Sequence, residues 1–238
     1  MFPLTYSIVD TEDYDNWFWF LDNLKSAIGM DQPITFISDR HVGLVNNVSD
    51  VFRNSHHAIC EHHMIENLRK DMKHIRNDVK KAIISAFQGA TRSFRREEFN
   101  LRIADIQNYS QEEFTWVATS TPGRWVTSIF RGKRYGHVTT NVAESFNNWI
   151  LEARELPILQ CLEKIRKQMT QLVVERLLKA QNWTTTLTPS VEKSLVAIVK
   201  TSISLCMIWV SNDEFEAIGD HNSCTINIST RECECQAW

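Results

Sequence analysis

The strongest constraint on the fold comes from residues 34–39, which read Ile-Thr-Phe-Ile-Ser-Asp. This apolar, β-branched and aromatic run predicts a short buried strand. The residues that follow carry Val42, Val45 and Val48 at helical spacing. Open α/β sheets place ligands at the carboxyl ends of their strands, so Asp39 occupies a position suited to chemistry. The alternative is that Asp39 only caps the next helix, because aspartate is a preferred N-cap residue.

The first part of the chain alternates predicted strands and helices. Residues 2–9 and 57–60 have strand patterns, and residues 13–29 have a broad apolar helical face that ends at a glycine. Strand, helix, strand, helix, strand is the order of an α/β layer with parallel neighbours. We therefore expect residues 1–61 to form one α/β segment.

Residues 62–135 change to a helical pattern with little strand signal. Between Met64 and Arg102 this block carries ten Lys or Arg and five acids, although the whole chain has a net charge of −3. Such asymmetry suggests a polyanion on one side of the block. A solvated helix surface explains the same pattern.

The remaining residues divide into a helical part, 136–203, and a β-rich end, 204–238. Helices are predicted over 141–155, over 159–182 with an apolar stripe from Leu162 to Leu177, and from Pro189 to about Ser202. The last part contains three short strand candidates, expected as hairpins, over residues 204–210, 214–218 and 224–228.

Composition narrows the class of protein. Glycine and proline are scarce, which argues against a long flexible linker. The sequence has no run of about 18 apolar residues, so no membrane span is predicted. Its start has no signal-peptide pattern. Six cysteines in such a chain suggest thiols or metal ligands rather than disulfides.

Four segments in fixed order carry a family resemblance. They are Phe36-Ile-Ser-Asp39-Arg40, Cys60-Glu-His-His63, the run from Arg134 through Glu144 to Ile150, and Cys233-Glu-Cys235. Together they resemble the transposases of plant Mutator-like elements (MULE), and residues 2–10 and 15–20 are similar to the same family. The resemblance extends over essentially the whole chain. It implies an RNase H-like core, here partial, interrupted by an all-helical insertion and followed by a short β-hairpin region.

The resemblance assigns catalytic roles to two acids. Asp39 would be the second and Glu144 the third member of a DDE triad, separated by 144 − 39 = 105 residues. Such acids hold the Mg²⁺ or Mn²⁺ ions that assist DNA cleavage and strand transfer. The family places its first acid on an earlier strand, so we expect this chain to be a truncated and inactive copy. Without the resemblance, the favoured interpretation of Glu144 is an acid placed well in the first turn of a helix.

The resemblance also assigns metal chemistry to cysteines. Cys60 and His63 match a family Cys-x-x-His element, which either binds metal or positions the acidic site. Cys233 and Cys235 resemble the first half of a SWIM zinc finger, and two thiolates alone do not complete a tetrahedral Zn²⁺ site. His221 and Cys224 could in principle supply the missing ligands.

A cluster of cations just before Glu144 suits DNA binding, and it consists of Arg124, Arg131, Lys133 and Arg134. The family implies the terminal repeats of a transposon as the DNA partner, a nuclear location, a possible homo-oligomer and no membrane partner. One alternative is a domesticated, non-catalytic DNA-binding or regulatory protein. Another is an unrelated helical interaction domain, in which Asp39 and Glu144 would lie far apart.

Overall fold

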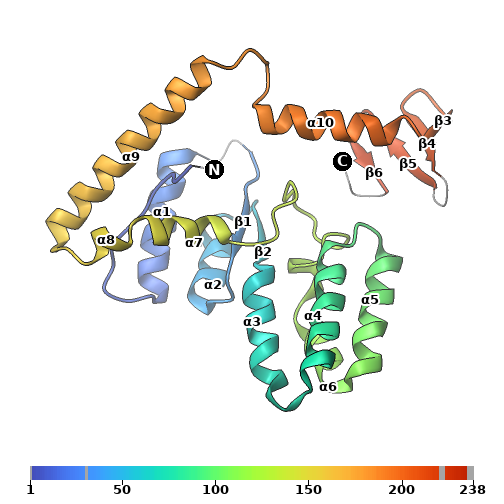
Figure 1. The fold of residues 1–238 in the computed structure, drawn as a ribbon, viewed down its shortest axis with the longest axis horizontal. Helices are drawn as coiled ribbons and strands as arrows, with labels where there is room; N and C mark the ends of the chain where they lie inside the picture. The colour runs from blue at the N-terminus through green and yellow to red at the C-terminus, as the bar shows by residue number, and fades with distance from the viewer. Residues whose placement is uncertain (1, 30–31, 220–222, 235–238) are drawn as a thin grey trace. The chain divides into compact units, whose positions relative to one another are not determined.

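The computed structural model describes residues 2–29, 32–219 and 223–234. The fold is mixed α/β with small sheets, as the sequence predicts at this level (Figure 1). The chain divides into two compact units, the first ending at Glu144 and the second beginning at Ser145. Among the helices of the described residues, none combines the length and the apolar character that a bilayer crossing needs.

The first unit begins with an α/β layer. Helix α1 (Tyr14–Ile28) starts where the side chain of Asp13 accepts a hydrogen bond from the backbone N–H of Asn16, and it ends at Gly29 with φ of +73°. Strand β1 (Thr35–Ser38), helix α2 (Val42–Val51) and strand β2 (His56–Ile59) follow. The two strands pair in parallel, with Ser38 opposite Ile59. The predicted strand–helix–strand unit is confirmed.

A small apolar core holds this layer together. Leu21 of α1 packs with Val48 and Val51 of α2 and with Phe52, all nearly inaccessible to solvent. Phe36 of β1 joins the core by a tilted contact with the ring of Phe52, at 4.8 Å between centroids. The helix pair α1 and α2 thereby covers the sheet.

The predicted strand over residues 2–9 is wrong. These residues have neither helical nor strand structure, and Leu4 and Ile8 are exposed. Alternation of apolar side chains is not sufficient for a strand, because a strand also needs a neighbour to pair with. In the described part of the first unit, β1 and β2 pair only with each other.

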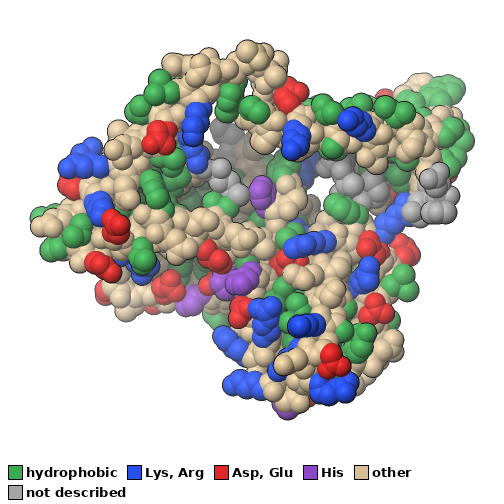
Figure 2. Space-filling view, viewed as in Figure 1, with side chains coloured by type: hydrophobic (Ala, Val, Ile, Leu, Met, Phe, Trp, Pro, Cys, Tyr) green, Lys and Arg blue, Asp and Glu red, His purple; other side chains and the backbone are tan. Residues whose placement is uncertain are grey.

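The helical block follows, as predicted. It comprises α3 (Glu61–Asp71), the 3₁₀ turn η1 (Met72–His74), α4 (Asn77–Arg92), α5 (Arg96–Tyr109), α6 (Gln111–Thr119) and the 3₁₀ turn η2 (Pro122–Arg124). Its core surrounds Trp125, whose ring stacks on Phe87 at 4.8 Å. Lys and Arg side chains are spread over its surface with acidic side chains among them (Figure 2).

The second unit continues helix α7 (Asn141–Trp149) and adds α8 (Leu151–Arg154), α9 (Ile158–Gln181) and α10 (Pro189–Ser202). In the described residues an antiparallel sheet follows, with strands in sequential order: β3 (Cys206–Trp209), β4 (Glu214–Ile218), β5 (Ser223–Asn227) and β6 (Glu232–Cys233). The hairpins agree with the sequence prediction apart from the added strand β6, and the single helix predicted over residues 141–155 is divided at Ile150 into α7 and α8.

The predicted buried stripe of α9 is largely wrong. Cys161 and Ile165 are buried, but Leu162 is 37% and Leu177 57% exposed. The heptad-like spacing identified the helix correctly. Burial depends on a facing element, and the spacing alone does not supply one.

Candidate active site

Asp39 follows β1 directly and is half-buried. Its Oδ1 accepts a hydrogen bond of 3.1 Å from the backbone N–H of His41. His41 itself is the N-cap of α2, and its side chain makes no capping hydrogen bond. The interpretation of Asp39 as a simple N-cap is therefore wrong, because the N-cap residue lies two positions later. One carboxylate oxygen is engaged by the backbone, and the carboxylate lies at the carboxyl edge of the sheet.

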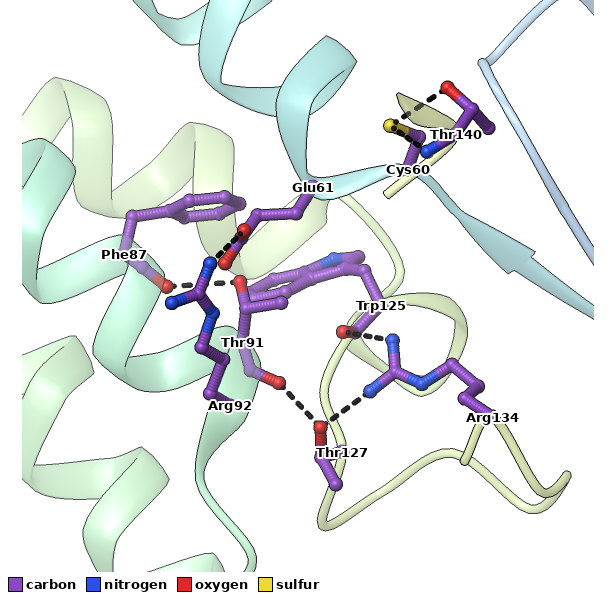
Figure 3. A network of polar contacts seen from close by, with 9 residues as sticks. All are labelled: Cys60, Glu61, Phe87, Thr91, Arg92, Trp125, Thr127, Arg134 and Thr140. Carbon is purple, nitrogen blue, oxygen red and sulfur yellow. Dashed lines mark hydrogen bonds and ion pairs between the residues drawn. The ribbon is translucent and has the colours of Figure 1, made fainter. Parts of the chain in front are cut away.

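Cys60 connects this edge to a segment eighty residues away. Its backbone N–H donates to the carbonyl of Ser38 at 2.7 Å, so it lies next to the end of β1. Its Sγ accepts hydrogen bonds from the backbone N–H and from Oγ1 of Thr140, at 3.2 and 3.3 Å (Figure 3). The neighbouring N–H of Glu61 donates to the carbonyl of Val138 at 2.8 Å. Three hydrogen bonds thus hold the two ends of the helical block together.

Glu144 lies one turn beyond this connection. Its backbone N–H donates to the carbonyl of Thr140 at 3.3 Å, which places Glu144 in the first turn of α7. Its Oε1 is buried and has no hydrogen-bond partner. A buried carboxylate oxygen without a partner is costly, and a bound ion or an ordered water commonly satisfies such an atom in proteins. The segments that carry Asp39 and Glu144 therefore meet at the carboxyl ends of β1 and β2.

Histidine nitrogens without hydrogen-bond partners belong to the same segments. Nδ1 is buried and unpartnered in His41, in His57 of β2 and in His63 of α3. His57 Nε2 lies 2.7 Å from Ser38 Oγ. Burial, and secondly the charge of Arg124, lower the pKa of His57 to about 4, while the charge of Asp39 opposes this change. His57 is therefore neutral near pH 7, and the charges of Asp39 and Arg124 both reach its ring.

The side chains at this edge of the sheet meet only part of what a hard cation such as Mg²⁺ requires. Two carboxylates, one with a buried unpartnered oxygen, fit Mg²⁺ or Mn²⁺, which prefer oxygen ligands. Within residues 2–29, 32–219 and 223–234, no three histidine, cysteine, aspartate or glutamate side chains form a group that could hold a metal ion.

The thiol of Cys60 is fully buried and engaged by Thr140. Its geometry favours the positioning role over metal binding with His63.

The sequence was also compared with known protein families. Residues 1–67 match the MULE transposase domain. The matched segment contains Asp39, Cys60 and His63 and ends within α3, before Glu144. No curated protein matches this chain.

The cations that follow the MULE-matched segment differ in exposure. Arg131 and Lys133 are exposed, and Arg124 is half-buried. Tyr135 is 83% exposed at the tip of a turn, in which the N–H of His137 donates to the carbonyl of Arg134 at 2.9 Å. This turn therefore presents an exposed aromatic ring two residues after the exposed Lys133.

Arg134 does not share this exposure. It is 8% exposed, and its guanidinium donates to the carbonyl of Trp125 at 2.9 Å and to Thr127 Oγ1 at 2.6 Å (Figure 3). It also lies 5.2 Å from the ring centre of Phe130. Burial lowers the pKa of Arg134, and the charge of Glu61 opposes this. The predicted DNA contact of Arg134 is not supported by this geometry, because its side chain is used inside the fold.

Gly132 fixes the position of the same loop against β2. A Cβ atom at this residue would lie 2.5 Å from His56 Cβ and 2.7 Å from Phe130 Cε1. Contacts this short require the backbone or a rigid side chain to move. The loop that carries Arg131 and Lys133 therefore approaches β2 as closely as a glycine permits.

Sequence patterns could not have identified several of these residues. Thr140 has only the general character of a residue before a helix, and its contact with a distant thiol leaves no local signal. Glu61, 2% exposed, forms an ion pair of 2.8 Å with Arg92 at the end of α4. Hydrogen bonds between residues far apart in the chain are set by the tertiary fold, not by spacing.

At the chain end, Cys233 lies on β6 and is half-buried. Its predicted partner Cys235 lies outside the described residues, as does His221. The sulfur of Cys233 lies 3.8 Å from the sulfur of Cys224 on β5.

Proposed function

We propose that this chain derives from a DDE-type DNA transposase of a plant Mutator-like element, with Asp39 and Glu144 as the second and third acids of the triad. The observation that carries the proposal is the hydrogen bonding of Cys60 to Thr140, which brings the α7 start to the carboxyl end of the sheet. The MULE match over residues 1–67 supports the assignment of Asp39 independently. In this proposal the α/β layer is part of an RNase H-like core, and residues 62–135 are the insertion.

Asp39 and Glu144 would hold Mg²⁺ or Mn²⁺. Bound divalent ions would stabilise the attacking and leaving oxygens during phosphodiester cleavage or strand transfer. The buried Oε1 of Glu144 fits such a role, because an ion would supply the partner that this oxygen lacks. Cys60 would be a positioning residue, since it contacts Thr140 and not the carboxylates themselves. A zinc half-site at Cys233 and Cys235 remains a separate prediction.

Two carboxylates fall short of a complete DDE triad. We therefore expect the 238-residue chain to be inactive, and to show no nicking of supercoiled plasmid DNA with Mg²⁺ or Mn²⁺ above a protein-free control. Gel electrophoresis of the open-circular product measures this. Metal-dependent nicking that Glu144→Gln abolishes would show that these residues suffice for catalysis.

DNA is the proposed partner, in particular the terminal repeats of the element, and the nucleus is the proposed location. Exposed Arg131 and Lys133 suit phosphate contacts, and the exposed ring of Tyr135 suits base stacking. Half-buried Arg124 is a further candidate because its charge reaches His57, close to Asp39. A homo-oligomer is possible on family grounds. The alternative, a domesticated DNA-binding or regulatory protein without catalysis, uses the same cations and predicts DNA binding without the metal site.

The shared acidic site can be tested by Mn²⁺ binding to the full chain. We expect Asp39→Asn and Glu144→Gln each to weaken Mn²⁺ affinity about 10-fold or more. Mutating a residue that only hydrogen-bonds to a metal ligand already lowers metal affinity by about this factor. The double variant is expected to bind Mn²⁺ at least as weakly as the weaker single variant, with a loss that differs from the sum of the two single losses, because neighbouring ligands of one ion are coupled. Calorimetric titration, or the electron paramagnetic resonance signal of free Mn²⁺, measures the affinity.

Glu155→Gln serves as the control, because Glu155 is an exposed acid just after α8. Its affinity should equal that of the unmodified chain. Independent, additive losses in the two single variants would mean that Asp39 and Glu144 act at separate places. That outcome would remove the main support for the transposase assignment and favour the non-catalytic alternative.

A further inference from the structure

Arg40 is an exposed cation that directly follows Asp39 after β1. The carboxylate of Asp39 accepts a hydrogen bond of 3.1 Å from the backbone N–H of His41, so Arg40 is the middle residue of a turn that its neighbour's side chain closes. The N–H of Cys60 donates to the carbonyl of Ser38 at 2.7 Å and holds the strand just before this turn. The backbone of Arg40 is therefore fixed at the edge of the sheet that carries Asp39.

The guanidinium of Arg40 lies over the ring of Trp116, with its central carbon 5.8 Å from the ring centroid. This distance is within the range of a cation–π contact. Trp116 belongs to α6 of the helical block, and it is half-buried against the apolar core around Trp125. Its ring is therefore a platform fixed by the packing of the block, and it limits the orientations that the long side chain of Arg40 can adopt.

The N–H donors of Arg40 are available to a ligand. Among residues 2–29, 32–219 and 223–234, Arg40 forms no ion pair, either with Asp39 or with any other acid, and its guanidinium makes no hydrogen bond. A guanidinium presents five N–H donors in one plane, and pairs of these donors match two oxygens of a phosphate. Arg40 is thus a positioned cation whose donors are not used inside the described fold.

A second cation approaches the same edge from the helical block. Arg124, in η2, is half-buried. Burial lowers the pKa of His57 to about 4, the charge of Arg124 acts in the same direction, and the charge of Asp39 opposes it. The charges of Arg124 and Asp39 therefore both act on one ring. Carboxylates such as Asp39 repel the phosphates of DNA, and neighbouring cations offset that repulsion.

We propose that Arg40 binds a phosphate of the DNA backbone beside Asp39, and that the ring of Trp116 positions it for this contact. The inference rests on the proposed function, because DNA is the partner there. It adds a cation from the α/β layer to the exposed cations of the loop that carries Arg131 and Lys133. The helical block then takes a direct part in binding at the sheet edge, because α6 supplies the ring that orients Arg40.

The salt dependence of DNA affinity tests the contact in the full chain. Binding of a short fluorescein-labelled duplex is followed by fluorescence anisotropy over a range of salt concentrations, with EDTA present so that no divalent ion contributes. Arg40→Ala should reduce the slope of log affinity against log salt by about 0.9, because one phosphate contact is lost. Arg40→Lys should keep the slope but bind more weakly, since an ammonium lacks the planar fork.

Arg53→Ala is the matched control. Arg53 is an exposed arginine between α2 and β2, at the opposite end of the two parallel strands. Its removal costs the chain the same charge as Arg40→Ala, so a change in overall charge alone would affect both variants equally. We expect the slope of Arg53→Ala to equal that of the unmodified chain, and an equal reduction in both variants would overturn the proposal.

The positioning role of Trp116 has its own test. Trp116→Leu removes the aromatic face without changing the charge, and it should weaken binding about 2- to 5-fold, the factor that corresponds to an exposed cation–π contact. In the Arg40→Ala background the same change should have no further effect, because the ring acts only through Arg40. A purely structural Trp116 would weaken binding equally in both backgrounds, and that result would overturn its positioning role.

A measurement on the unmodified chain does not depend on how the variants fold. Phenylglyoxal modifies arginine side chains, and mass spectrometry of the digested chain reads out each arginine. At a duplex concentration of about ten times Kd, modification of Arg40 should be slowed about 10-fold, because only about a tenth of the chain is then free. Arg53 should react at the same rate with and without duplex. Equal modification of Arg40 in both conditions, or no binding of the duplex at all, would overturn the proposal.

Failure of this contact and failure of the proposed function give different results. If Arg131→Ala and Lys133→Ala reduce the slope but Arg40→Ala does not, DNA binding stands and the contact of Arg40 is wrong. If Asp39→Asn and Glu144→Gln leave Mn²⁺ affinity unchanged but Arg40→Ala reduces the slope, the metal site is wrong and the contact of Arg40 stands.

Discussion

Replacing Trp125 with alanine is expected to lower the free energy of unfolding of the first unit by about 3–5 kcal/mol. Trp125 is fully buried, stacks on Phe87 and meets the edge of Phe99 at 6.2 Å between ring centres. Its Nε1–H donates to both the carbonyl and the hydroxyl of Ser120, each at 3.1 Å. The variant would leave a large cavity and two acceptors without their donor. Urea unfolding followed by circular dichroism measures the change.

Two further variants separate packing from hydrogen bonding. Trp125→Phe keeps most of the ring but loses the donor, and should cost about 1–3 kcal/mol, the range for an unsatisfied buried group. Trp19→Ala is the control, because Trp19 on α1 is 54% exposed, and it should change stability much less. Equal losses at Trp19 and Trp125 would mean that the core of the helical block does not depend on Trp125.

Arg134→Ala is expected to lower the free energy of unfolding by about 2–3 kcal/mol, because hydrogen bonds to charged groups contribute about 1.5–3 kcal/mol. Its guanidinium holds the carbonyl of Trp125 and the hydroxyl of Thr127, and Thr127 Oγ1 in turn donates to the carbonyl of Thr91 at 2.8 Å. The loop before α7 is thereby attached to the end of α4. The same unfolding measurement applies, with Lys133→Ala as the exposed neighbouring control.

Measurements of DNA binding can distinguish the exposed cations Arg131 and Lys133 from the buried Arg134. Arg131→Ala and Lys133→Ala should each reduce the slope of log affinity against log salt by about 0.9 if each side chain contacts one phosphate, with little change in stability. Arg134→Ala should leave this slope unchanged in conditions where the variant is folded. Fluorescence anisotropy with a labelled duplex measures the slope. A reduced slope in a stable Arg134→Ala variant would restore Arg134 to the DNA-binding set.

Local patterns predicted much of the secondary structure. The run that ends at Asp39, the glycine after α1 and the proline at the start of α10 each specify a boundary by backbone chemistry, and the helices and hairpins follow. The prediction of a strand over residues 2–9 was wrong because a strand needs a second segment to pair with. The stripe of α9 failed for a related reason, since apolar spacing identifies a helix without identifying what covers it.

The sequence identified two candidate acids, but it did not identify the residues that support them. Asp39 and Glu144 carry recognisable sequence surroundings, and the family resemblance gave them roles. Arg134 looked like its neighbours in the sequence, yet it is buried while Arg131 and Lys133 are exposed. Whether a cation faces solvent depends on where its loop packs, and here Gly132 and His56 set that position.

The hydrogen bonds between Cys60 and Thr140 and between Glu61 and Val138 have an evolutionary consequence. They close the helical block at its base, so its entry and exit are joined by contacts that do not themselves involve α4, α5 or α6. Closing a longer or shorter loop changes the entropy only slowly with length. Insertions and deletions among α4, α5 and α6 can therefore accumulate without shifting the first turn of α7, which leaves that block free to diverge while the acids keep their places in the fold.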